Sequence, residues 1–225
     1  MIVHGAAIKS PHSTLVRSNI EHPCVARPME ALSHQGWQQE LLQVNHDGVI
    51  PDEAYKNING NNVSLISVML ANNETGAIQE MSTLSHFAKE KKALSHTDAV
   101  QAFGKMNVRF DELEIDAMTL SSHKIYGPQG VGALILNKRS DIEPLIYGGG
   151  QEKNLRSGTE NIAAIVGFGK ACELISESFK ETSLLTRELQ TTLELHLKEL
   201  GAVIFSEKVK RLSNTTFFAF KDIEG

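Results

Sequence analysis

The chain has 225 residues, of which 41% are hydrophobic and 22% are charged, and its formal net charge is −5. The length allows a substantial buried core, and the mildly acidic balance argues against nucleic acid or an anionic membrane as a partner. Cys24 and Cys172 match neither a disulfide framework nor a zinc site, so we expect a reducing, cytoplasmic setting. The longest apolar run, residues 63–71, has about half the length of a membrane-spanning helix.

Short apolar segments alternate with longer amphipathic ones, which is typical of an α/β protein with a mainly parallel sheet. The predicted strands are 15–20, 40–44, 63–70, 93–97, 116–122 and 131–136. The predicted helices are 28–35, 51–58, 80–92, 99–103 and a long one over 160–199. We expect no helix before the first strand, and we expect Pro28 to begin its helix and not to lie inside it.

The last part of the chain departs from this alternation. After Gly201, the segments AVIF and NTTFFAF predict two strands with no helix between them. We therefore expect a large domain over 1–177, lacking its N-terminal part, and the incomplete start of a small α+β domain over 178–225.

Polar clusters follow the predicted strands, where an open α/β sheet gathers its ligand site. These clusters are EHP (21–23), ANNETG (71–76), HTDAVQ (96–101) and SSHK (121–124), and a fifth, GGGQEKNLRSGTEN (148–161), comes after the last strand. The loops therefore predict one site that is assembled from several segments.

The residue types in these clusters suit one kind of cofactor. The amine of Lys124 can bond to an aldehyde, and the carboxylate of Asp98 can hold a proton on a ring nitrogen. Gln101 can donate to a ring oxygen, and Ser121 and His123 are suited to a phosphate. An aldehyde partner, an acid and phosphate ligands are what pyridoxal 5'-phosphate requires.

Each residue also has a plainer interpretation. Lys124 alone is typical of a solvated strand end, Asp98 of a cap for a helix at 99–103, and His22 before Pro23 of a helix start. NNETG alone indicates a turn, and the glycine-rich stretch 148–158 indicates a flexible loop. We favour the cofactor because the residues fit it jointly, whereas we expect His96 and Cys172 to be structural and no metal site to form.

The motifs together reach a known family. SNIEHPCV, SVMLANNETGAIQ, HTDAVQAFGK, SSHKIYGPQGVGAL and GGGQEKNLRSGTEN stand in that family's order and near its spacing. Over residues 18–161 the chain closely resembles the cysteine desulfurases and selenocysteine lyases, in the class V aminotransferase group of fold type I pyridoxal-phosphate enzymes. The remainder to residue 225 is compatible with the same family.

The resemblance implies a role for each site residue. Lys124 would hold the cofactor covalently and later move the substrate proton, and His22, the second catalytic residue, would stack on the cofactor ring. Asn73 would lie against the ring or the substrate. Asp98 would pair with the pyridine nitrogen, Gln101 with the ring hydroxyl, and Ser121 and His123 with the phosphate. Thr159 would reach the phosphate of a neighbouring subunit, which implies a homodimer.

The activity that the resemblance implies is conversion of L-cysteine to L-alanine. The sulfur would leave as an enzyme persulfide, for a sulfur-acceptor protein and the synthesis of iron–sulfur clusters or other sulfur-containing cofactors. Two alternatives stay open: a selenocysteine lyase, acting on L-selenocysteine, or another class V aminotransferase; and a catalytically silent fragment that binds the cofactor or a partner.

The family's pattern also implies parts beyond this chain. Its phosphate-binding glycine-threonine turn would precede Met1, and its nucleophilic cysteine and carboxylate-binding arginine would follow Gly225. We therefore expect the central piece of a longer enzyme, and we do not expect Cys24 to be the nucleophile.

Overall fold

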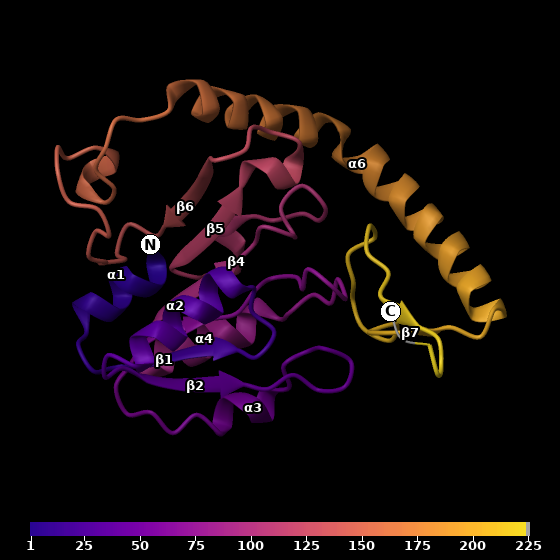
Figure 1. Cartoon of the computed structure of the whole chain (residues 1–225), viewed down its shortest axis with the longest axis horizontal. Helices are drawn as coiled ribbons and strands as arrows, with labels where there is room; N and C mark the ends of the chain where they lie inside the picture. The colour runs from indigo at the N-terminus through magenta and orange to yellow at the C-terminus, as the bar shows by residue number, and fades with distance from the viewer. Residues whose placement is uncertain (224–225) are drawn as a thin grey trace.

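The computed structural model describes residues 1–223 as a six-stranded sheet between helices, followed by a long helix and a two-stranded hairpin (Figure 1). The strands are β1 (Thr14–Ser18), β2 (Gln38–Leu42), β3 (Val63–Ser67), β4 (Leu94–Asp98), β5 (Ala117–Ser121) and β6 (Gly132–Leu136). Their order is β2-β1-β3-β4-β5-β6. Neighbours from β2 to β5 pair in parallel, and β6 is antiparallel to β5. The predicted α/β class, the mainly parallel sheet and all six predicted strands are confirmed.

Helices cover both faces of this sheet. They are α1 (Ile2–Lys9), α2 (Pro23–Ser33), α3 (Asp52–Lys56), α4 (Met81–Lys91), the short α5 (Phe110–Leu113) and α6 (Ile162–Glu199), with 3-10 turns η1 (Ser122–Ile125) and η2 (Glu152–Asn154). Strands β1 and β3 are buried along nearly their whole length because their alternate side chains enter two separate cores. In β1, for example, Leu15 packs with α1 and α2, whereas Val16 packs with α3 and α4.

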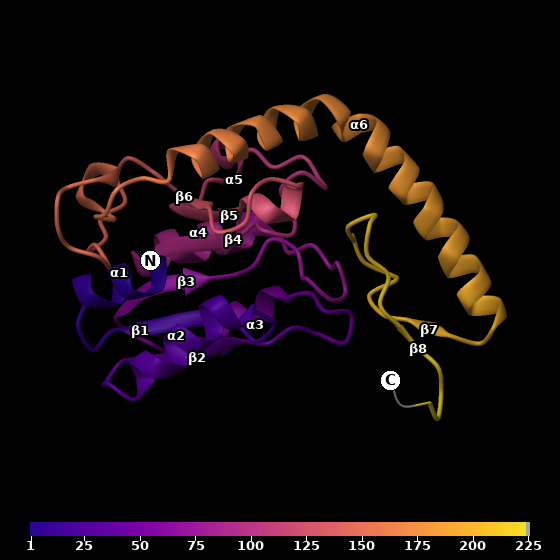
Figure 2. The same ribbon diagram turned by 45° about the horizontal axis from the view of Figure 1, so that its top comes forward.

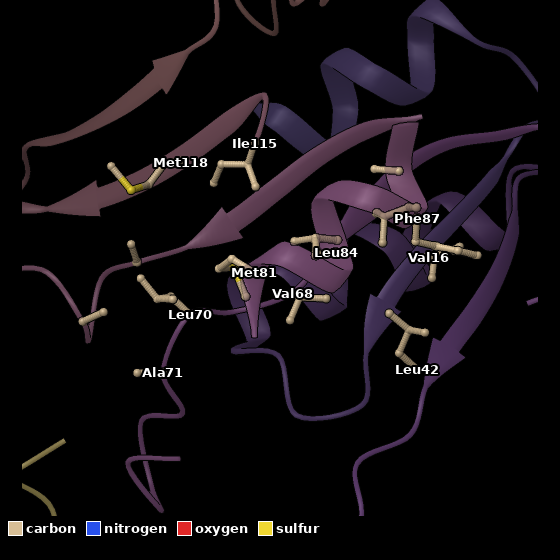
Figure 3. Packing of buried hydrophobic residues seen from close by; sticks show 14 of the residues in the cluster. Val16, Leu42, Val68, Leu70, Ala71, Met81, Leu84, Phe87, Ile115 and Met118 are labelled. Atoms are coloured by element: carbon tan, nitrogen blue, oxygen red, sulfur yellow. The ribbon is translucent and has the colours of Figure 1, made fainter. Parts of the chain in front are cut away.

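The larger core lies between the sheet and α4. Leu84 and Phe87 of α4 pack there with Val16 and Leu42, and Met81 lies near Val68 (Figure 3). Leu84 is fully buried, so its truncation to alanine would cost about 2–5 kcal/mol of unfolding free energy.

Three expectations about helices were wrong. A helix does precede the first strand, because Ile2, Val3 and Ala6 share one buried face of α1. Pro28 lies inside α2 and removes one backbone hydrogen bond, but the apolar face of that helix continues across it and stays buried.

The third wrong expectation concerns residues 99–103, which make a single turn and no helix. Phe103 N donates to Ala99 O, and Gly104 then takes a positive φ of 78°, which ends the helical path. The short α5 further on was not expected at all.

The C-terminal part begins with α6, which extends beyond the sheet and carries the hairpin under its far end (Figure 2). The predicted strands after Gly201 are confirmed as the pair β7 (Val203–Ile204) and β8 (Phe218–Ala219). Helix α6 runs unbroken through residues 177 and 178, so the division there remains a prediction, and residues 224–225 lie outside the described part.

Backbone hydrogen bonds connect this C-terminal part to the sheet. Ile78 N donates to Lys210 O at 2.9 Å, and Leu212 N donates to Gly76 O at 2.9 Å. The loop after β3 is therefore joined directly to the segment before β8. In the part of the chain described, no helix is both long and apolar enough to cross a membrane.

His96 lies fully buried in β4, in agreement with the structural role expected for it. Its Nδ1 contacts Ser67 Oγ at 2.8 Å, and its Nε2 contacts Thr119 Oγ1 at 2.5 Å. Burial, with a smaller effect of the positive N-terminus, lowers the pKa of His96 to about 3. The ring is therefore neutral at physiological pH and ties three neighbouring strands together.

We expect the His96→Gln variant to differ from wild type in how its unfolding free energy depends on pH, because the buried neutral ring is absent from the variant. Below the unfolded pKa of about 6.5 the unfolded chain takes up a proton that folded His96 refuses, so wild-type stability falls by up to about 1.4 kcal/mol per pH unit. The variant should be about 1–3 kcal/mol less stable at pH 7, with the gap closing toward pH 4. Urea unfolding at several pH values measures this, with exposed His34→Gln as the control; a constant gap would contradict it.

Candidate functional site

A cleft of about 410 Å³ opens at the carboxyl ends of β3, β4 and β5, next to the start of α2. It is lined by His22, Cys24, Met69, Asn73, Asp98, Val100, Gln101, Ser121, His123 and Lys124. Parallel strands bring their carboxyl ends to one edge of a sheet, so four loops that are far apart in sequence meet here. Seven of the eight predicted cofactor-binding residues therefore share one cleft, and their individual roles remain predictions.

Lys124 lies in η1, the 3-10 turn that follows β5. The turn is closed by Gly127 N, which donates to Ser122 O at 3.0 Å. A Cβ at position 127 would lie 2.2 Å from Ser122 Oγ, so only glycine fits without a shift. The exposed Lys124 is thus carried by a closely packed backbone.

Asp98 ends β4, and only 5% of its surface is exposed. Its Oδ1 accepts from Val100 N at 2.9 Å, and its Oδ2 faces Cys24 Sγ at 3.7 Å. Burial raises the pKa of this carboxyl, and the bond from Val100 N opposes the rise. Because 99–103 is not a helix, the helix-cap interpretation is wrong, although Asp98 does accept a bond within its own turn.

His22 and Asn73 border the cleft from two other loops. His22 is the N-cap of α2, and its Nδ1 accepts from Cys24 N at 3.2 Å, so the neutral ring carries its proton on Nε2. The helix-start interpretation of His22 and a place in the cleft are therefore compatible. In NNETG, Asn72 makes the turn by accepting from Glu74 N and Thr75 N, which leaves Asn73 exposed at the cleft.

Ser121 and His123 stand on either side of the buried Ser122. Ser121 Oγ and His123 Nδ1 are 2.9 Å apart, and both side chains line the cleft. Thr159 lies in the exposed loop between η2 and α6, and it is absent from the set of described residues that line the cleft.

Met69 and Val100 are cleft residues that the sequence reasoning missed. Met69 lies near the end of the apolar run 63–71 that contains β3, and Val100 stands between Asp98 and Gln101. Their positions next to predicted residues could have identified them, but neither side chain carries a chemical group that would have drawn notice.

Glu21 lies directly behind the cleft and is 8% exposed. Its Oε1 accepts from Ser18 Oγ at 2.5 Å and from Met69 N at 2.6 Å, whereas its buried Oε2 has no partner among the described residues. Burial raises the pKa of Glu21 to about 8. This carboxyl is therefore mainly protonated at neutral pH.

Neither cysteine has the setting of a nucleophile. Cys172 packs against the larger core, as expected. Cys24 stands on the first turn of α2, and burial together with the charge of Asp98 raises the pKa of its thiol to about 11. The reactive thiolate is therefore scarce at neutral pH.

Comparisons with known proteins agree with this geometry. The chain is 39% identical to "Cysteine desulfurase" of Bradyrhizobium diazoefficiens, with 100% of this chain and 57% of the relative covered. It is 40% identical to "Cysteine desulfurase IscS" of Dictyoglomus turgidum, with 100% and 58% covered. The chain thus spans little more than half the length of these relatives.

Solved structures share the fold. A "NifS-like protein" superposes with a TM-score of 0.93 at 36% identity, over 99% of this chain and 62% of that one. The structure titled "SspA in complex with cysteine" superposes with a TM-score of 0.85 at 33% identity, over 98% and 62%. The predicted fold type I architecture is confirmed by these neighbours.

We expect the Asp98→Asn substitution to make Cys24 more reactive. Loss of the negative charge removes one cause of the raised pKa while burial, the larger cause, remains, so the thiolate fraction at pH 7.5 should rise about 3- to 10-fold. The rate of iodoacetamide alkylation measures this in a Cys172→Ser background. An unchanged or slower rate in Asp98→Asn would show that Asp98 does not govern the thiol.

The family comparison covers the whole chain. The family model described as "Aminotransferase class-V" matches residues 1–225. The chain therefore belongs to the class-V aminotransferase family.

Proposed function

We propose that the chain is the cofactor-binding part of a pyridoxal-phosphate-dependent cysteine desulfurase. The observation that carries the proposal is the meeting of Lys124, Asp98, Gln101 and the phosphate-type donors around one cleft of about 410 Å³. Members of this family are pyridoxal-phosphate enzymes, and the matched relatives are named cysteine desulfurases. The parent activity would convert L-cysteine to L-alanine.

The donor set of the cleft fits the cofactor. Asp98 is a buried acceptor suited to a protonated ring nitrogen, and the exposed ring of His22 offers a stacking face. Ser121, His123 and the amide of Gln101 supply hydrogen-bond donors, and Asn73 borders the space left for the substrate. When bound, the cofactor supplies an electron sink for the bond changes at the substrate.

Lys124 is the residue proposed to act on protons. Its Nζ would hold the cofactor covalently and, once the substrate amine takes its place, would remove the substrate α-proton. Among the side-chain hydrogen bonds of the described residues, none involves Lys124 Nζ, so its amine is free for both tasks. Asp98 would hold the proton on the ring nitrogen of the bound cofactor. This would favour the loss of the substrate α-proton.

The sulfur transfer would need a thiolate that this chain does not supply. The substrate's Cβ–S bond breaks, the sulfur joins an acceptor cysteine as a persulfide, and alanine is left. With a pKa of about 11 and a fixed place on α2, Cys24 is unsuited to that task. We assign the acceptor to a cysteine outside these 225 residues, with a sulfur-acceptor protein, iron–sulfur cluster synthesis and a cytoplasmic location following from the same proposal.

We expect the purified chain, mixed with pyridoxal 5'-phosphate, to show visible absorbance that borohydride abolishes and converts into a permanent covalent adduct. Lys124→Ala should bind the cofactor about 10-fold or more weakly and form no adduct, because the amine is gone. Absorbance and intact-mass measurements check this, with exposed Lys170→Ala as the control. An unchanged adduct in Lys124→Ala would refute the role of the lysine.

The homodimer is proposed because Thr159 is exposed and stands apart from the cleft lining. If its hydroxyl reaches a phosphate, that phosphate belongs to a second copy. We expect sedimentation to give twice the 24.7 kDa of one chain in the presence of cofactor. We also expect Thr159→Ala to weaken cofactor binding about 3- to 10-fold. A monomer whose affinity is insensitive to this change would contradict the proposal.

A further inference from the structure

The turn after β4 places a lysine next to a cleft residue. Lys105 Nζ lies 2.6 Å from Gln101 Oε1. An ammonium group has three donors and no acceptor, so the atom of the amide that faces it must be the oxygen. The N–H donors of Gln101, on Nε2, therefore point away from Lys105.

The two residues face different spaces. Gln101 lines the cleft, whereas Lys105 lines a second cavity of about 60 Å³ between η1 and α6. Among the described residues, that cavity is lined by hydroxyl, amide and apolar side chains and by two lysines, but by no carboxylate. Lys105 is half-buried, and the amide oxygen of Gln101 is thus the hydrogen-bond acceptor for its ammonium group among the described residues.

We propose that Lys105 is a positioning residue that holds the amide of Gln101 with its N–H donors directed into the cleft. The inference rests on the proposed function, in which those donors meet an oxygen of the cofactor ring. Without the lysine, the amide can rotate and present its oxygen to the cleft, where two oxygens without a hydrogen between them would repel each other.

The surroundings of Lys105 disfavour its positive charge, so the ammonium group gains more from its hydrogen bond to Gln101. Burial lowers the pKa of Lys105, and the nearby Lys124 lowers it further, so the ammonium form is costly at this place. A charge-assisted hydrogen bond from Lys105 to the Gln101 oxygen offsets part of that cost and is stronger than one between neutral groups. The same bond therefore keeps the cation in place and orients the amide.

A double-mutant cycle tests the proposal. We compare pyridoxal 5'-phosphate affinity for wild type, Lys105→Met, Gln101→Ala and the double variant, with exposed Lys56→Met as the matched control. Lys105→Met should weaken binding about 3- to 10-fold in the wild-type background and have little effect in the Gln101→Ala background, because it acts through that amide. Lys105→Arg, which keeps a donor, should recover most of the loss. Equal effects in both backgrounds, or no effect in either, would overturn the proposal.

The direction of the amide is tested separately. Gln101→Glu can still accept from Lys105 but has no N–H to give, so it should weaken cofactor binding at least as much as Gln101→Ala. Retention of wild-type affinity by Gln101→Glu would show that the cleft does not use the donor.

A measurement without cofactor separates this inference from the proposed function. In the cofactor-free chain, the side-chain amide signal of Gln101 in ¹⁵N NMR is identified by its loss in Gln101→Ala. Lys105→Met should move this signal, and Lys56→Met should not. An unmoved signal would overturn the positioning itself. A moved signal with no cofactor binding by wild type would instead refute the proposed function, and with it the purpose assigned to the amide.

Discussion

The structure depends on a parallel sheet that is buried on both faces. Neighbouring residues such as Leu15 and Val16, or Leu65 and Ile66, enter opposite cores and are all fully buried. Such strands need helices on both faces, and each parallel connection must cross from one end of the sheet to the other. The polar residues that follow the strands consequently gather at one edge, where the cleft lies.

The departure from parallel pairing at β6 has its own consequence for the cleft. Because β6 runs antiparallel to β5, no helical crossover is needed, and the short link through η1 carries Lys124. Ser122 N donates to Val131 O at 3.2 Å, which fixes this link at its base, and Gly127 lets its backbone pass close to Ser122. The lysine thus projects from a short, doubly anchored turn.

The sequence predicted all six strands and most of the cleft because period, turn residues and polar clusters are local signals. It failed where tertiary packing decided the outcome: α1 is held by the core although Met1 offers no side-chain cap, and Pro28 is tolerated because its helix has a buried face. The pairing of Lys105 with Gln101 was likewise unforeseen, since the helix expected at 99–103 ended before Lys105.

Two buried carboxyl groups, those of Glu21 and Asp98, lie next to each other at the cleft but have different surroundings. Glu21 is buried with one oxygen unpaired, and its pKa of about 8 leaves it mainly neutral, so it can serve as a bridge between Ser18 and Met69 without adding charge. Burial raises the pKa of Asp98, and the bonds that it accepts from Val100 N and Cys24 Sγ oppose that rise. A neutral Glu21 imposes no like-charge repulsion on Asp98, so a second negative charge does not add to the effect of burial on the carboxyl that faces the cleft.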